Sequence, residues 1–179
     1  ETEQLFILAL KNRTDYVILK KTNDGVEEFL SFGTEKVWGF KARNSSIYVV
    51  QSNQVKVFDY LGTVKTTYPK STYEYRSLDI ASNGEVYVGT TGTIQKISQT
   101  GMTLFYNLGY EVKSIAISSD NKVIFLAPSI SGVYQYNNNA RVFLTPASGI
   151  NALATNKDGN ILLMDNNGTR LFSKGLITR

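Results

Sequence analysis

One pattern recurs four times along the chain and leaves few folds open to it. Phe40, Leu78, Ile115 and Leu153 occupy the same place in this pattern, and the spacings between them are 38, 37 and 38 residues. After each of them come a polar turn, a run rich in Val, Ile, Tyr and Leu, and two further short apolar segments separated by turns. Such a period predicts copies of one supersecondary unit that bury their apolar surface by stacking on one another.

Each unit is predicted to contain four short β-strands, which we call a to d in chain order. Val, Ile, Tyr, Phe and Thr dominate the segments, and no segment has helical periodicity. Asn, Asp and Gly in the first turn are typical of tight hairpins, because they tolerate positive φ or bond their own backbone. The four turns are Asn44-Ser45, Asn83-Gly84, Asp120-Asn121 and Asp158-Gly159.

The segment before Trp38 fits the same scheme with one strand missing. LFILAL is predicted to be strand b, DYVILKK strand c and VEEFLSF strand d, with a turn at Thr22–Gly25 between the last two. The chain therefore contains four full units and three strands of a fifth.

Four-stranded units at this spacing are typical of β-propeller blades. A single four-stranded sheet cannot bury both its faces, and stacking sheets around an axis buries them in series. An all-β sandwich is the alternative, but it needs no repeat this regular. The sequence predicts an all-β propeller of about five four-stranded blades, the first lacking its inner strand, as one domain over residues 1–179. The predicted blades are a partial blade at 1–33 and full blades at about 34–72, 73–109, 110–147 and 148–179.

The second and fourth units resemble the NHL-repeat family of β-propellers. The resemblance lies in Ser77–Val88, followed by Gly92-Thr93-Ile94 and the turn at Thr100-Gly101, and it returns in Ala152–Ile161. At blade level it covers about residues 37–179, and the first unit departs most, with Lys41 in its inner strand. The resemblance implies a propeller fold. Its members include protein-binding, RNA-binding and a few enzymatic proteins.

Composition excludes several kinds of chemistry. The chain has no Cys and no His, which removes thiolate catalysis, disulfides, zinc sites built from these residues and the Ser-His-Asp triad. The resemblance to propeller lyases and lactonases fails on the same ground, because those enzymes depend on His or on a metal cage. The sequence predicts a protein that is not an enzyme and needs no cofactor. Its charge of +4 fits an anionic partner without requiring one.

The candidate ligand-binding residues lie in the connections from d to the next a, and from b to c, which reach one side of a propeller. Tyr, Trp and Arg dominate binding hot spots and also stack on sugars or bases. For Trp38 alone, packing between blades is the favoured interpretation; for the set, ligand binding is. Replacing Tyr73, Tyr75 and Arg76 together by Ala is expected to abolish binding without unfolding. The candidates are Trp38, Tyr68, Tyr73, Tyr75, Arg76, Tyr110 and Lys113, with Glu111 beside them.

The function predicted from these features is non-catalytic recognition of a protein or glycan. Single-stranded RNA binding by an NHL-like face is one alternative, although no basic run supports it; a metal-assisted propeller enzyme is a weaker one. Asp79 and Lys41, at similar inner-strand positions, are expected to form a salt bridge facing the channel rather than a catalytic pair.

Partners and location are predicted only broadly. Completion of the ring by a second copy of this chain, or by an additional chain, is also an expectation. No membrane span is expected, since the longest apolar run is Leu5–Leu10. The richness in Asn, Ser, Thr and Tyr favours an extracellular or cell-surface location.

Overall fold

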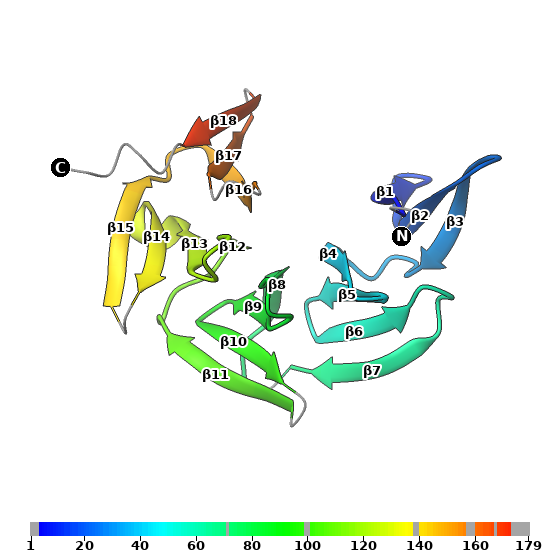
Figure 1. Cartoon of the computed structure of the whole chain (residues 1–179), viewed down its shortest axis with the longest axis horizontal. Helices are drawn as coiled ribbons and strands as arrows, with labels where there is room; N and C mark the ends of the chain where they lie inside the picture. The colour runs from blue at the N-terminus through cyan, green and yellow to red at the C-terminus, as the bar shows by residue number, and fades with distance from the viewer. Residues whose placement is uncertain are drawn as a thin grey trace. The chain divides into compact units, whose positions relative to one another are not determined.

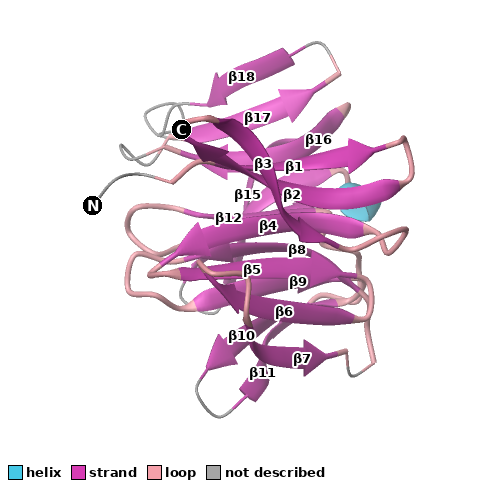
Figure 2. Cartoon of the chain, turned by 90° about the vertical axis from the view of Figure 1, so that its right-hand side faces the viewer, coloured by secondary structure: helices cyan, strands magenta, loops and turns pink. Residues whose placement is uncertain are grey.

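A computed structural model describes residues 4–70, 72–98, 101–137, 140–156, 160–166 and 168–172. Strands make up its regular structure, together with one three-residue 3₁₀ helix at Pro128–Ile130 (Figure 2). The chain divides into two compact units, Glu1–Lys70 and Ser71–Arg179, which are described separately. Among the described residues, no helix is long and apolar enough to cross a membrane.

The first unit contains two antiparallel sheets, each a meander in chain order (Figure 1). The first sheet has three strands, β1 (Phe6–Lys11), β2 (Asp15–Thr22) and β3 (Gly25–Ser31). The second has four, β4 (Val37–Arg43), β5 (Ser46–Gln51), β6 (Gln54–Asp59) and β7 (Val64–Pro69).

The second unit contains three further sheets of the same kind. One comprises β8 (Tyr75–Ile80), β9 (Val86–Thr90), β10 (Thr93–Ser98) and β11 (Gly101–Asn107). The next comprises β12 (Ser114–Ile117), β13 (Val123–Ala127), β14 (Gly132–Asn137) and β15 (Ala140–Pro146). The last has β16 (Ile150–Thr155), β17 (Ile161–Asp165) and β18 (Gly168–Phe172), and the fourth strand expected there falls at residues outside the described part of the chain.

The register of the hairpins follows from turn chemistry. Asn44 and Ser45 have φ of 51° and 56°, the two successive positive values of a type I′ turn. This two-residue turn pairs Arg43 directly with Ser46 and so sets the alignment of β4 with β5. In the second unit Gly84 and Asn121 also have positive φ at the predicted turns.

The core lies between successive sheets, as stacked blades require. In β9 and β13 every residue is buried, whereas the outer strands β7 and β15 are mostly exposed and β11 has only half-buried and exposed residues. Phe125 of β13 packs in a cluster with Tyr87 and Ile94 of the preceding sheet, whereas Ile124 packs toward Leu163 of the following one. Strand b therefore carries buried apolar residues on both of its faces. In β17, Ile161 and Leu163 are buried while the alternate residues are half-buried.

The positions of register shifts in the strand pairs identify whether a strand is a, b, c or d of its blade. The b–c pairs of the four later sheets are regular, whereas β6–β7, β10–β11 and β14–β15, all c–d pairs, contain a shift. In the first sheet β1–β2 is regular and β2–β3 shifts between Ile18 and Leu19. Strand β1 also approaches β4 as β9 approaches β12 and β13 approaches β16. The first sheet therefore contains strands b, c and d, and the prediction that it lacks its inner strand is confirmed for the described residues.

Polar side chains on the inner strands join successive sheets in the second unit. The carboxylate of Asp79 accepts hydrogen bonds from the backbone N–H of Ile117 at 2.8 Å and of Ile80 at 2.9 Å. The Ser114 hydroxyl accepts from the N–H of Leu153 at 3.0 Å. Asp79 is thus a buried link between two sheets, and its expected salt bridge with Lys41 stays a prediction.

Candidate ligand-binding side

The candidate site is built from the d–a and b–c connections, whose side of each sheet we call the d–a side. In the first unit it includes the d–a connection at 32–36 and the b–c turns at 12–14 and Ser52-Asn53. In the second it includes residues 72–74 before β8, the connections at 108–113 and 147–149, and the b–c turns at Thr91-Gly92 and 128–131. The two units are treated in turn.

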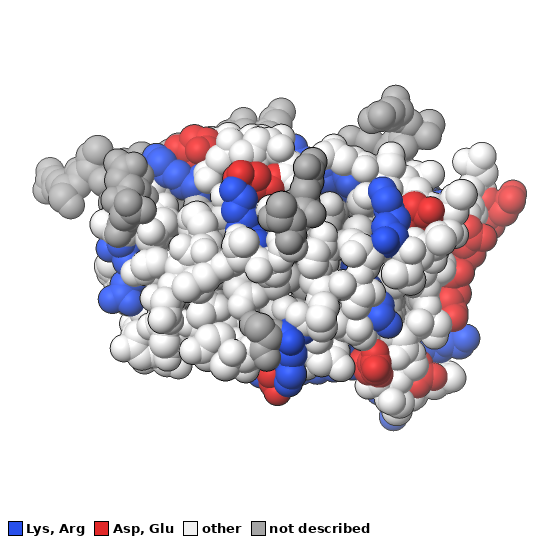
Figure 3. Space-filling model, turned by 90° about the horizontal axis from the view of Figure 1, so that it is seen from below, with Lys and Arg blue, Asp and Glu red and all other residues white. Residues whose placement is uncertain are grey.

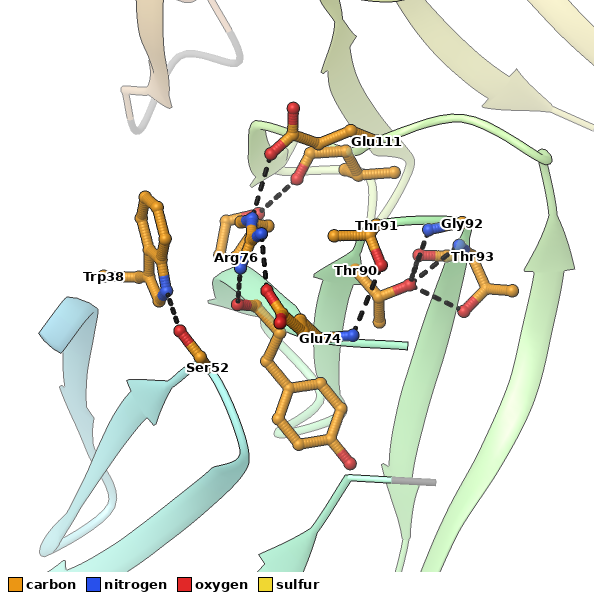
Figure 4. Close-up of polar contacts among 12 residues, drawn as sticks. Trp38, Ser52, Glu74, Arg76, Thr90, Thr91, Gly92, Thr93 and Glu111 are labelled. Atoms are coloured by element: carbon orange, nitrogen blue, oxygen red, sulfur yellow. Dashed lines mark hydrogen bonds and ion pairs between the residues drawn. The ribbon is translucent and has the colours of Figure 1, made fainter. Parts of the chain in front are cut away.

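Trp38 lies at the start of β4 and is held by two contacts. Its indole N–H donates a hydrogen bond to the hydroxyl of Ser52 at 2.9 Å (Figure 4). The Lys36 ammonium lies 3.5 Å from the centroid of its ring. A cation over an indole face is attracted by the electron density of the ring. Trp38 therefore fixes the positions of a cation and a hydroxyl on the d–a side.

A pocket of about 160 Å³ opens beside Trp38. Gln51 forms its base: the side chain is buried, donates to the Glu35 carboxylate at 2.5 Å, and accepts from the Gln54 amide at 2.9 Å. The exposed residues of the lining are Glu35, Lys36 and Asn53, and one carboxylate oxygen of Glu35 is engaged by Gln51. The pocket is lined by Glu35, Lys36, Gln51, Ser52 and Asn53.

Sequence reasoning missed the lining of this pocket. It placed the site in the d–a and b–c connections but selected aromatic and basic residues there, whereas the five lining side chains are polar and only one of them is basic. The available signal was the two-residue Ser-Asn turn between two apolar strands, which brings the b–c connection back beside the d–a connection. Single polar residues of this kind are common in every turn, so composition alone does not mark them.

Tyr68 lies on β7, directly opposite Val55, and does not line the pocket. Its neighbour is Tyr48, whose pKa is raised by burial and, to a lesser extent, by Tyr68. Tyr68 therefore lies on the same face of this sheet as Tyr48.

In the second unit Arg76 is the centre of an ion-pair network. Its guanidinium donates to the carboxylate of Glu74 at 2.7 Å and to that of Glu111 at 2.9 Å, and its side chain is 15% exposed (Figure 4). A third contact reaches the backbone carbonyl of Tyr75 at 3.3 Å. The network joins the start of β8 to the connection before β12. Arg76 therefore has a structural role that the sequence did not reveal.

Tyr75 and Tyr73 are packed differently from the exposed aromatic surface that the sequence predicted. Tyr75 is 1% exposed, and burial raises the pKa of its hydroxyl. The ring of Tyr73 lies against Gly92, where an added Cβ would be 2.4 Å from Cε1 of the tyrosine. Replacing Tyr73, Tyr75 and Arg76 together would therefore disturb packing, which corrects the expectation that this substitution tests binding alone.

Tyr110 and Lys113 are the candidates that solvent reaches. Tyr110 is 42% exposed, and Lys113 donates to the side chain of Asn151 at 2.9 Å. Asn151 in turn donates to Asn166 at 2.7 Å, which extends the polar surface to the last sheet. In the second unit the exposed part of the d–a side therefore runs from Tyr110 across the start of β12 to β16.

The most strongly shifted tyrosine lies away from this side. Tyr87 follows the a–b turn, and burial, followed by its hydrogen bond to Glu85 at 2.8 Å, raises the pKa of Tyr87 to about 12. Lys96 also contacts the Glu85 carboxylate and lowers the pKa of Glu85. The hydrogen bonds that Glu85 accepts from Tyr87 and Lys96 form a structural cluster at the start of β9. Among the described residues, no group of three or more His, Cys, Asp or Glu could hold a metal ion.

Solved structures of β-propellers resemble this chain. Virginiamycin B lyase from Staphylococcus aureus matches with a TM-score of 0.66 and 15% identity over 96% of this chain and 73% of the lyase. The WD40 β-propeller domain of Doa1 matches with a TM-score of 0.67 and 14% identity over 93% of this chain and 62% of that one. A protein assigned as a gluconolactonase matches with a TM-score of 0.71 and 9% identity over 89% of this chain and 69% of that one.

At identities this low the likeness shows the fold alone. No model of a protein family matches the chain, and no curated protein sequence matches it. The fold is that of β-propeller proteins, among which these neighbours include a lyase, a protein assigned as a gluconolactonase and a WD40 domain.

Proposed function

We propose that this protein is a recognition module that binds a protein partner through the d–a side and catalyses no reaction. In the first unit the pocket beside Trp38 forms the candidate anchor point. In the second unit Tyr110 and Lys113 form a separate candidate contact. Tyr75 is excluded from the binding surface because it is buried. The WD40 domain among the structural neighbours supports an interaction role for this fold.

The observation that carries the proposal is the position of Lys36. Its ammonium is held 3.5 Å over the Trp38 ring while the residue lines an open pocket with Ser52 and Asn53. A cation next to hydroxyl and amide groups suits a carboxylate, which accepts several hydrogen bonds at once. The ligand group assigned to this pocket is therefore an acidic side chain of the partner.

The carboxylates of the d–a side favour recognition over catalysis. Glu74 and Glu111 are held by Arg76, and Glu35 is held by Gln51. General acid–base work needs a group that can exchange a proton with a substrate near neutral pH. Carboxylates fixed by a guanidinium and an amide instead position the loops that carry them.

RNA binding receives less support. On the face seen in Figure 3, blue Lys and Arg side chains alternate with red Asp and Glu side chains and do not form a continuous basic band. Single-strand binders combine such a band with stacked aromatic side chains. The likeness of two units to NHL repeats stays a prediction. RNA binding by analogy with members of that family stays a prediction with it.

Site-directed photocrosslinking tests the proposal. A photoreactive residue at Asn53 marks the mouth of the pocket, and one at Asn44 marks the opposite end of β5 as a matched control. Both positions are exposed turn residues, so surface reactivity alone affects them equally. We expect a protein adduct from the native source at Asn53 that Asn44 does not give.

A second variant links the adduct to the cation. Lys36→Gln should reduce the Asn53 adduct at least about tenfold, the loss expected for one charged hydrogen bond, whereas Lys36→Arg should retain most of it. Equal labelling at Asn53 and Asn44, or an adduct unaffected by Lys36→Gln, would contradict the proposal. An adduct lost on enzymatic deglycosylation of the partner would assign the site to a glycan.

A further inference from the structure

Strand β1 presents an open backbone edge in the first unit. The N–H of Lys21 donates to the carbonyl of Leu5 at 2.9 Å, which makes this a hydrogen-bonded pair. Because such pairs alternate along antiparallel strands, Phe6, Leu8 and Leu10 direct their N–H and C=O groups away from β2. In the described part of the chain no strand pairs with that edge.

The other four sheets show what this edge accommodates. In each of them strand b pairs on the same edge with an antiparallel inner strand: β5 with β4, β9 with β8, β13 with β12 and β17 with β16. The register shifts identify β1 as the b strand of its sheet. We propose that the outward edge of β1 is a docking site for one extended peptide segment from another polypeptide, which pairs antiparallel with β1 as the innermost strand.

The side chains around the edge indicate an apolar segment. Leu5, Ile7 and Leu10 are 53%, 42% and 54% exposed, an unusual apolar exposure for one short strand. A paired strand would cover these side chains and satisfy the outward backbone groups together. Main-chain pairing then supplies affinity, and the alternate side chains supply selectivity.

The neighbouring strand β4 adds a second requirement. The two-residue turn makes Arg43–Ser46 a hydrogen-bonded pair, so the N–H groups of Phe40 and Ala42 point away from β5. These two residues correspond in the repeat to Leu153 and Ile117, whose N–H groups bond to Ser114 and Asp79 of the preceding inner strand.

A segment with Ser or Asp between its apolar residues would make the same bonds to β4. The peptide class is therefore short and extended, with small or apolar residues alternating with Ser or Asp. A second copy of this chain fits less well, because the inner strands of the described sheets are already paired and would have to leave their own sheets.

The probe is a synthetic peptide that copies the inner-strand sequence VKSIAIS, residues 112–118, with a lysine tail for solubility. The control peptide has proline in place of the alanine that corresponds to Ala116, which removes a backbone donor from its centre. Binding to the full-length chain is measured by calorimetry. Hydrogen exchange is followed at the amides of Phe6, Leu8 and Leu10. We expect the probe, and not the control, to bind and to slow exchange at these three amides.

Variants of Leu10 separate backbone pairing from side-chain contact. Leu10→Pro removes one outward N–H without touching the bonds to β2 and should weaken probe binding about tenfold, the value of one hydrogen bond of about 1.4 kcal/mol. Leu10→Ala keeps the N–H, and we expect it to bind the probe within about threefold of the parent. Failure of Leu10→Pro to fold would leave the exchange measurement on the parent chain as the deciding test.

Four results would overturn the proposal. Two of them are binding of the probe without protection of the three amides, and no binding at all. Another is slow exchange at these amides before any peptide is added, in a manner independent of protein concentration, because the edge would then be paired within the chain. The last is protection that rises with protein concentration alongside dimer formation, which would assign the edge to a second copy.

Discussion

The carboxylate of Asp79 on β8 accepts a hydrogen bond from the backbone N–H of Ile117 on β12 at 2.8 Å, so that one side chain joins two sheets. The side chain is 8% exposed and also accepts from the N–H of Ile80. Chain connection alone would leave these two sheets joined by a loop. The buried carboxylate gives their inner strands a fixed alignment.

Removing this link should destabilise the second unit. Asp79→Ala leaves the Ile117 N–H without its acceptor, and we expect the free energy of unfolding to fall by about 2–3 kcal/mol, the cost of a lost charged hydrogen bond in a buried place. Asp79→Asn keeps an acceptor oxygen and should cost less than half as much. Urea denaturation measures both. Equal losses for the two variants would show that charge, and not the hydrogen bond, is the important property.

The contact between Tyr73 and Gly92 makes a steric prediction. A Cβ at Gly92 would lie 2.4 Å from the Tyr73 ring, so Gly92→Ala should destabilise the protein by about 1–3 kcal/mol through overpacking. The double variant with Tyr73→Ala should recover part of that loss in a double-mutant cycle. Gly39→Ala is the matched control, because nothing lies within 4 Å of its added Cβ. Additive losses in the cycle would mean that the two residues do not contact each other.

The ion-pair network of Arg76 should matter more than an isolated surface pair. Arg76→Ala removes contacts to two carboxylates from a side chain that is 15% exposed, and we expect a loss of about 1 kcal/mol. Lys11→Ala removes a single pair with Glu28 whose side chains are 56% and 38% exposed, and should change stability less than Arg76→Ala does. Thermal unfolding at low and high salt distinguishes them. A larger loss for Lys11→Ala would contradict the structural role of Arg76.

Tyr87 predicts how stability depends on alkaline pH. Its pKa is raised from 10.0 to about 12 in the folded chain, chiefly by burial and then by Glu85. A folded pKa above the unfolded value means that this contribution is fully present below the unfolded pKa and is lost as pH rises through the folded pKa. The free energy of unfolding should therefore fall from about pH 10 to 12 less steeply in Tyr87→Phe than in the parent. Parallel pH profiles for the two proteins would disprove this assignment.

Strand order and blade repeat followed from local patterns. The Asn44-Ser45 turn predicts its hairpin, because residues that adopt positive φ favour a tight turn. The apolar run from Val123 to Leu126 predicts its own burial. The missing inner strand of the first sheet was also readable, since the chain before Trp38 contains three apolar segments and not four.

The site was less readable from the same sequence. Tyr75 and Tyr110 are the same residue type at neighbouring positions of the repeat, yet one is 1% and the other 42% exposed. Arg76 was selected for its chemistry as a hot-spot residue, but two carboxylates hold it, one of them 35 positions away in the chain. Burial and pairing depend on residues far along the chain, which no local pattern contains.

By itself, the order of amino acids determined that this chain folds into repeated four-stranded antiparallel sheets, because alternation, turn residues and period act over a few neighbouring positions. Only the tertiary structure decided which groups meet, such as Lys36 with the Trp38 ring beside a pocket and Asp79 with the N–H of Ile117. It also decided which strand edge of the described residues stays open, that of β1. The physical reason is that hydrogen bonds require distances of about 3 Å, and the atoms that meet in the Asp79–Ile117 contact belong to residues 38 positions apart, which only stacked sheets bring that close.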